Sequence, residues 1–128
     1  MKLLVDTHVF LWMAFEPQRL SSVARTALQD GDNPIVVSVV TAWELGTAIG
    51  RQRLELEGPV EEFVHGHCEQ MDAAILGITL EHAHAAARLP WVHRDPFDRM
   101  LAAQALTEGL PLVTGDRKIP LLGVDVIW

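Results

Sequence analysis

The sequence predicts an α/β fold in which helices cover a mainly parallel central sheet. Short apolar runs typical of buried strands alternate along the 128 residues with longer segments of helical periodicity. Strands separated by helices are joined by crossover connections, and such connections give parallel pairing. A chain of this length is enough for one domain, so we expect residues 1–128 to form a single unit.

The composition is that of a globular protein, and it is consistent with a reducing compartment. Apolar residues make up 49% of the chain, and the single cysteine, Cys68, excludes an internal disulfide and a cysteine-based zinc site. No apolar run approaches the ~18 residues of a membrane span, and Asp6 interrupts the first run too early for a signal peptide. We therefore expect a cytoplasmic protein without membrane contact. The net charge of −7 argues against a basic DNA-binding face, but not against an enzyme whose acids hold metal ions.

Five apolar stretches are predicted to be strands because they are short and bounded by turn residues. The first ends abruptly in a carboxylate, Asp6. The second is rich in β-branched residues and follows the turn cluster at residues 31–34. The expected strands are residues 3–5, 35–38, 74–78, 110–114 and 124–127.

Six segments are predicted to be helices from their apolar spacing and their start and stop signals. Asp95 and Pro96 are the strongest start, an N-cap acid followed by proline at the first helical position, and we favour capping as the main role of Asp95. Gly50 and Gly109 end two of the helices. The helices are expected at residues 9–15 (short and mostly buried), from Ser21 or Ser22 to about 28, and at 41–49, 60–68, 79–89 and 96–108.

Four carboxylates are expected to meet at one edge of this sheet. In a parallel α/β sheet, the ends of the strands and the starts of the following helices share the edge where ligands bind. Asp6 and Asp116 follow the first and fourth strands, and Glu44 and Asp98 lie in the first turns of two helices. The four acids converge provided that the central strands are neighbours.

Four ionised acids in one place repel one another unless a cation lies between them. Oxygen ligands without cysteine select a hard ion, Mg²⁺ or Mn²⁺. Two such ions ~3.5–4 Å apart can clamp the attacking water and the leaving oxygen of a phosphodiester. This chemistry needs no serine, cysteine or histidine nucleophile, and the sequence presents no convincing one.

Each acid also has a purely structural interpretation. Glu44 fits a capping box with Thr41, Asp98 fits the positive end of a helix dipole, and Asp116 fits a turn. Asp6 is the exception, since an acid that ends an apolar strand has no local structural reason.

Four motifs in the chain resemble the successive motifs of PIN-domain ribonucleases, and more narrowly those of the VapC-type toxins of bacterial toxin–antitoxin pairs. They are LVDTH at 4–8, SVVTAWEL at 38–45, RDPFDR at 94–99 followed by LAAQA at 101–105, and TGD at 114–116. One motif alone is a weak signal, but four in order at matching separations are a strong one. The resemblance covers essentially the whole chain.

This resemblance implies a three-layer α/β/α sandwich, a homodimer, and an endoribonuclease silenced by a cognate antitoxin protein. It implies RNA hydrolysis with Mg²⁺ or Mn²⁺, leaving 5′-phosphate and 3′-hydroxyl ends. The family often carries a lysine one turn after the second acid, where this chain has Ala48. By resemblance, the catalytic and metal-holding acids are Asp6, Glu44, Asp98 and Asp116, and the supporting residues are Thr7, Thr114 and Asp95.

Basic residues flank the proposed acids, where they either contact the RNA backbone or balance local negative charge. The histidine pairs 65/67 and 82/84 are expected at the surface or an interface, because residues two apart on a helix face different sides. His93 lies close to Asp95 in sequence and within reach of the site edge. We expect Trp12, Trp43, Trp91 and Phe97 in the core or an interface rather than as base-stacking platforms. The candidate RNA-binding residues are Arg51, Arg94, Arg99, Arg117 and Lys118.

The sequence has three rival functional interpretations: a phosphatase, a dinucleotide-binding domain and an inert binding module. A phosphatase of the haloacid-dehalogenase type needs a second aspartate two residues after Asp6, where this chain has His8, and no glycine-rich dinucleotide motif follows the first strand. The main alternative is a PIN-like protein- or RNA-binding module whose metal site is inert. The complete set of four acids argues against that module.

Overall fold

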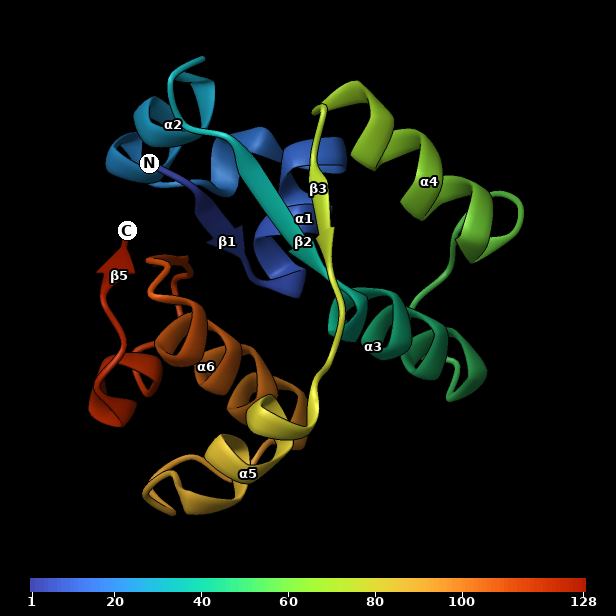
Figure 1. Cartoon of the computed structure of the whole chain (residues 1–128). Coiled ribbons are helices and arrows are strands. Elements are labelled where there is room, and N and C mark those ends of the chain that lie inside the picture. Colours follow the sequence, from blue (N-terminus) through green and yellow to red (C-terminus); the bar gives the residue numbers. More distant parts are fainter.

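The computed structural model describes all residues, 1–128, and shows a five-stranded sheet in the order β3-β2-β1-β4-β5 (Figure 1). Every neighbouring pair of strands is parallel, as the alternation of strands and helices predicts. The central position of β1 confirms the condition on which the convergence of the acids depends. The strands are β1 (Leu3–Val5), β2 (Ile35–Ser38), β3 (Ala74–Leu76), β4 (Leu112–Val113) and β5 (Val126–Ile127).

Helices pack on both faces of the sheet, so the expected three-layer α/β/α sandwich is confirmed (Figure 1). None of them combines the length and the apolar character needed to cross a lipid bilayer. They are α1 (Thr7–Phe15), α2 (Ser22–Gln29), α3 (Val39–Gly50), α4 (Val60–Gln70), α5 (Leu80–Arg88) and α6 (Pro96–Glu108), with the 3₁₀ turns η1 (Pro17–Arg19) and η2 (Ile119–Leu122).

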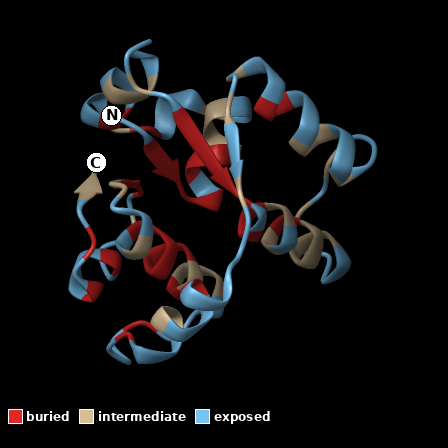
Figure 2. Ribbon diagram, in the orientation of Figure 1, coloured by how far each residue is buried: buried red, intermediate tan, exposed pale blue.

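The alternation of side chains along β1 divides the core into two halves. Leu4 faces the half that α5, α6 and η2 cover, whereas Leu3 and Val5 face the half covered by α1, α2 and α4. Figure 2 shows the buried residues concentrated in β1, β2 and α6. Strand β3 is different, because it is an edge strand and Ile75 in it is 57% exposed.

Two helices begin earlier than the sequence predicts. Helix α1 starts at Thr7 because Asp6 itself caps it, and its far end is exposed at Phe15, so this helix is less buried than expected. Helix α3 starts at Val39 because the Ser38 hydroxyl accepts a 3.0 Å hydrogen bond from the backbone N–H of Val40. Strands β3 and β4 are shorter than predicted.

The register of the central strands aligns three residues that leave the sheet together. Val5 pairs with Val37 on one side and with Val113 on the other. The next residue of each strand therefore emerges at the same carboxyl edge, and these residues are Asp6, Ser38 and Thr114.

A buried glutamine ties helix α6 to this edge. Gln104 is fully buried, its Oε1 accepts a 2.6 Å hydrogen bond from the Ser38 hydroxyl, and its Nε2 donates to the Gly77 carbonyl at 3.2 Å. Because Ser38 ends β2 and Gly77 follows β3, one side chain holds α6 against two strand ends.

Replacing Gln104 by methionine should lower the free energy of unfolding by about 1–3 kcal/mol, because the buried groups of Ser38 and Gly77 lose their partner. Urea unfolding measures the change. Gln29→Met, at the exposed end of α2, is the matched control and should stay within about 0.5 kcal/mol of wild type. Equal effects of the two substitutions would contradict the role assigned to Gln104.

Candidate functional site

Asp6 is held at the carboxyl edge by two hydrogen bonds from different parts of the chain. Its Oδ1 accepts a 2.7 Å bond from the backbone N–H of Val9 in the first turn of α1. Its Oδ2 accepts a bond from the hydroxyl of Thr114, which follows β4. The residue is only 5% exposed, so the orientation of its carboxylate is fixed.

Asp98 and Asp116 meet at the same edge, on either side of a histidine. Nε2 of His93 lies 3.2 Å from Oδ2 of Asp98 and 2.8 Å from Oδ2 of Asp116. One potential ligand atom of each of the three residues lies within 4.8 Å of the others. Two acids that lie 18 positions apart in the sequence are thereby brought to one point.

Thr114 connects Asp6 to Asp116. Its hydroxyl donates to Asp6 and accepts a 3.1 Å hydrogen bond from the backbone N–H of Asp116. The Oδ1 of Asp116 in turn accepts a 2.9 Å bond from the backbone N–H of Lys118. The loop after β4 is thus ordered around the acids.

Glu44 lies in the second turn of α3 and is half-buried. The predicted capping box between Thr41 and Glu44 is wrong, because α3 begins at Val39 and its N-cap is Ser38. The hydroxyl oxygen of Thr41 instead lies 3.3 Å from that of Thr7, within hydrogen-bonding distance. Oε1 of Glu44 is buried without any hydrogen-bond partner. A buried carboxylate oxygen with no partner is costly and needs an explanation.

Burial and mutual repulsion raise the pKa values of three of the acids. Burial is the main reason that the pKa of Asp98 rises from 3.8 to about 7, and the charges of Asp95, Glu44 and Asp116 add to it. Burial likewise raises the pKa values of Asp6 and Glu44. The charge of Asp116 adds to the raised pKa of Asp6, and the charge of Asp6 adds to that of Glu44, so neighbouring acids of the four repel one another.

The pKa of Asp116 is shifted in the opposite direction. Its burial acts to raise its pKa, but the hydrogen bonds from the Lys118 backbone and from His93 outweigh burial and lower the pKa below the ordinary value. Asp116 is therefore the acid of the cluster that stays ionised most readily.

The residues present fit a divalent cation. The donors are carboxylate oxygens, which hard ions such as Mg²⁺ and Mn²⁺ prefer. One of these oxygens lacks a partner, and the pKa of Asp98 is raised by uncompensated negative charge nearby as well as by burial. A cation at this edge supplies what the cluster lacks.

Comparisons with known proteins agree with this geometry. The family model described as PIN domain matches residues 3–124. The chain belongs to the PIN-domain family. It is 35% identical over 117 residues to Ribonuclease VapC22 of Mycobacterium tuberculosis (strain ATCC 25618 / H37Rv), an alignment that covers 91% of this chain and 88% of that protein. The resemblance to VapC-type members of the family is thus confirmed.

Solved structures support the fold of this PIN domain. A VapBC2 structure from Rickettsia felis bound to a promoter DNA fragment matches with a TM-score of 0.74 at 14% identity, covering 98% of this chain and 97% of that one. VapBC-5 from Mycobacterium tuberculosis, described as a member of the VapBC family of toxin–antitoxin systems, matches with a TM-score of 0.63 at 20% identity, covering 98% and 97%. FitAcB from Neisseria gonorrhoeae matches with a TM-score of 0.62 at 22% identity, and the alignment covers 97% of this chain and 95% of that one.

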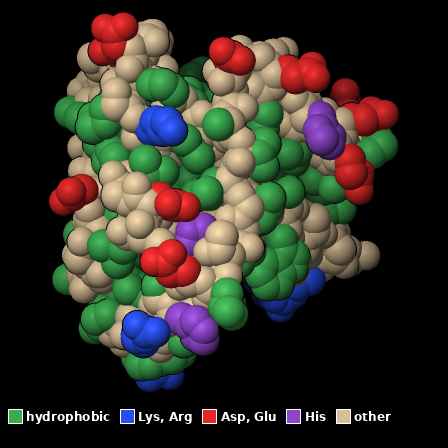
Figure 3. Space-filling model, in the orientation of Figure 1, with side chains coloured by type: hydrophobic (Ala, Val, Ile, Leu, Met, Phe, Trp, Pro, Cys, Tyr) green, Lys and Arg blue, Asp and Glu red, His purple; other side chains and the backbone are tan.

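Most of the other residues singled out in the sequence of this PIN domain lie near the acids or at the surface. Asp95 is the N-cap of α6, as expected, and its Oδ1 accepts from the backbone N–H groups of Phe97 and Asp98 at 2.9 and 3.1 Å. Thr7 is buried beside Thr41. Four of the candidate RNA-binding residues are exposed, namely Arg51, Arg94, Arg117 and Lys118, and the face shown in Figure 3 carries no continuous basic patch.

Arg99 is not available to a phosphate, so the expectation for this residue is wrong. It is 4% exposed, and its guanidinium lies 3.7 Å from the centre of the Trp91 ring. Sequence alone does not reveal a buried arginine whose partners are carbonyl groups. Its nitrogens donate at 2.7–3.0 Å to four of these, on Ala86, Leu89, Pro90 and His93.

Two histidine side chains do not lie at the surface, and two of the four aromatic residues expected in the core or an interface are exposed. His67 and His82 are buried rather than at the surface, where His67 contacts the Phe10 carbonyl at 2.9 Å and His82 completes the cap of α5. Trp43 and Trp91 are 57% and 65% exposed and so lie outside the core. His93, expected within reach of the site edge, lies between the carboxylates of Asp98 and Asp116.

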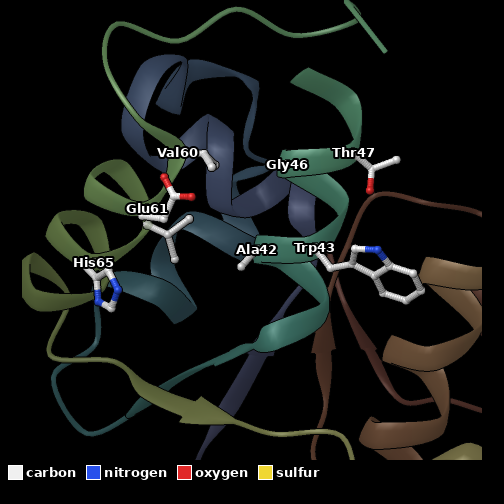
Figure 4. A pocket seen from close by; sticks show the side chains of 8 residues that line it. Ala42, Trp43, Gly46, Thr47, Val60, Glu61 and His65 are labelled. Carbon is white, nitrogen blue, oxygen red and sulfur yellow. The ribbon is translucent and has the colours of Figure 1, made fainter. Parts of the chain in front are cut away.

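A groove of about 490 Å³ lies between α3 and α4, beside the acidic cluster rather than at it (Figure 4). Trp43 projects from the α3 side of this groove, and its ring packs edge-on against Phe97 at the start of α6, with 4.7 Å between the centroids. The groove therefore adjoins the helix turn that carries Asp98.

The metal-free protein should lose stability as the pH rises from about 4 to about 7. The pKa of Asp98 is about 7 in the folded protein against an ordinary 3.8, so the folded state binds more protons over this interval and its free energy of unfolding falls with pH. Urea unfolding in the presence of a chelator at pH 5 and pH 7.5 measures the trend.

Asp98→Asn is the control for this prediction and should make the pH dependence shallower, because asparagine does not titrate. A pH slope that is unchanged in Asp98→Asn would contradict the assignment of the raised pKa to this residue.

Proposed function

We propose that this protein is a Mg²⁺- or Mn²⁺-dependent endoribonuclease and the toxin of a type II toxin–antitoxin pair. The observation that carries the proposal is the convergence of Asp6, Glu44, Asp98 and Asp116 at the carboxyl edge of the sheet. The name of the 35% identical relative, a ribonuclease, supports RNA as the substrate.

The four acids are the proposed ligands of the ion. A bound divalent ion supplies positive charge against the negative charge that develops on a phosphodiester undergoing hydrolysis. The protein fixes Asp6 through the first turn of α1 and the hydroxyl of Thr114, so this carboxylate needs no reorganisation. Asp98 and Asp116 are the proposed residues that orient the attacking water, because an oxygen of one lies within 4.8 Å of an oxygen of the other. Products with 5′-phosphate and 3′-hydroxyl ends are expected.

Four exposed basic residues are proposed to contact the RNA backbone, and Arg99 is not among them because its guanidinium is buried. Phosphate contacts of this kind position the substrate and carry no sequence information. The proposed residues are Arg51, Arg94, Arg117 and Lys118.

A cognate antitoxin protein is the proposed partner, since one structural relative is by its title a member of the VapBC family of toxin–antitoxin systems. We further propose a homodimer, as the resemblance implies. Preparations for activity measurements must therefore be free of any co-purified protein.

Asp6→Asn should keep the fold and lower metal-dependent RNA cleavage by about 100-fold or more, because even residues that only hydrogen-bond to metal ligands change activity by about 10–100-fold. Cleavage of a mixed pool of structured RNAs is measured with Mg²⁺, with Mn²⁺ and with chelator. The matched control is Asp32→Asn in the exposed turn before β2, which should cleave like wild type.

Cleavage that persists in chelator or in Asp6→Asn would contradict the proposed mechanism. Absence of cleavage by the wild type, together with absence of Mn²⁺ binding, would instead favour the binding module with an inert metal site.

A further inference from the structure

His93 is the one residue at the centre of the acidic cluster that is not an acid, and the proposed function gives it no role. It is 6% exposed and lies in the loop between α5 and α6. Its ring contacts three aspartates: Nε2 faces Asp98 and Asp116, and Nδ1 lies 3.3 Å from the backbone nitrogen of Asp95. All the polar atoms of the ring are therefore engaged inside the protein.

These contacts determine which ring nitrogen carries the hydrogen. The backbone N–H of Asp95 is a donor, so Nδ1 of His93 accepts and presents a lone pair. In a neutral imidazole the hydrogen is then on Nε2, which donates it towards the two carboxylates, at 2.8 Å to Asp116 and 3.2 Å to Asp98. This ring orientation places Nε2–H beside two carboxylate acceptors and Nδ1 beside the N–H donor of Asp95.

The same contacts argue against His93 as a metal ligand. Ligation through Nε2 requires a lone pair there, so the hydrogen would have to move to Nδ1. On Nδ1 it would point at the N–H of Asp95, and two donors would face each other. The N-cap of α6, which fixes Asp95, thus stabilises the form of His93 that donates.

The position of His93 is set by the helix that carries Asp98. The carbonyl of His93 accepts a 2.9 Å hydrogen bond from the guanidinium of Arg99, the residue after Asp98. The same guanidinium holds the carbonyls of Leu89 and Pro90 earlier in the loop. Arg99 therefore connects the backbone of His93 to the helix turn that carries Asp98, one of its acceptors.

We propose that His93 is a positioning residue that bridges Asp98 and Asp116 through its Nε2–H and sets the separation of the carboxylates that receive the ion, without binding the ion itself. This inference rests on the proposed metal dependence and refines it. It predicts a site that uses oxygen ligands alone and so accepts Mg²⁺ as well as Mn²⁺, whereas an imidazole ligand would favour later transition metals such as Zn²⁺.

Nitrogen-15 NMR of the full chain labelled at histidine tests the proposal directly. We expect the His93 ring to give the pattern of a hydrogen on Nε2 and a bare Nδ1, both before and after saturation with Mg²⁺. The signal is assigned by its loss in His93→Gln. A ring whose hydrogen is on Nδ1, with Nε2 shifted as a ligand when Mg²⁺ binds, would overturn the proposal.

Two variants measure the effect on the ion. His93→Leu removes the donor at similar volume and should weaken Mn²⁺ binding, followed by Mn²⁺ electron paramagnetic resonance, by about 10–100-fold. His93→Gln retains an N–H donor and should recover most of that loss. His84→Leu, on the exposed side of α5, is the matched control and should bind Mn²⁺ like wild type.

The outcomes separate this inference from the proposed function. Mn²⁺ binding that is lost in Asp98→Asn but unchanged in His93→Leu overturns the role of His93 and leaves the metal site standing. A wild type that binds no Mn²⁺ overturns both. If His93→Leu does not fold, the NMR result on the wild type and the affinity of His93→Gln decide.

Discussion

The arrangement of the acidic site in this PIN domain depends on the hydrogen bonds that the buried carboxylate of Asp6 accepts. This carboxylate ends the central strand, caps α1 through the N–H of Val9, and receives the hydroxyl of Thr114 from the strand beside it. Helix, strand and loop are thus connected at one charged group that is only 5% exposed. A charge in that position is costly unless it is hydrogen-bonded and compensated, and the protein alone supplies hydrogen bonds but not enough positive charge.

The rest of the cluster follows the same logic. The sheet brings the ends of β1 and β4 together, and α3 and α6 add Glu44 and Asp98 at the same edge. The repulsion between these acids destabilises the fold, and the two apolar cores, one on each face of the sheet, offset it. The proposed ion would relieve this repulsion, so its binding would stabilise the folded protein.

Sequence reasoning located the acids because the rule that it used is local. An acid directly after an apolar strand, such as Asp6, or within a few residues of its end, such as Asp116, is brought to the carboxyl edge by the strand itself. The N-cap of α6 was equally accessible, because Asp95 and Pro96 are a helix start in sequence alone. The start of α3 was misjudged by two residues because Ser38 both ends β2 and caps the helix.

Contacts that involve loops could not be predicted from the sequence. His93 meets Asp116 across 23 positions without any periodic signal, and only the folded loop between α5 and α6 brings it there. Arg99 lies in a motif that suggests a phosphate contact, yet its partners are carbonyls of α5 and of the loop between α5 and α6, which no pattern of residue types encodes. Both residues show that the surroundings of the acids are set by tertiary structure.

The measurement that tests the central claim most directly is anomalous diffraction from crystals of the protein grown with Mn²⁺. The account predicts an anomalous peak at the carboxyl edge, surrounded by oxygens of Asp6, Glu44, Asp98 and Asp116. Nε2 of His93 is expected to be hydrogen-bonded to carboxylates and outside the ligand sphere. Well-ordered crystals with no anomalous peak at that edge, or with Mn²⁺ bound only elsewhere, would contradict it.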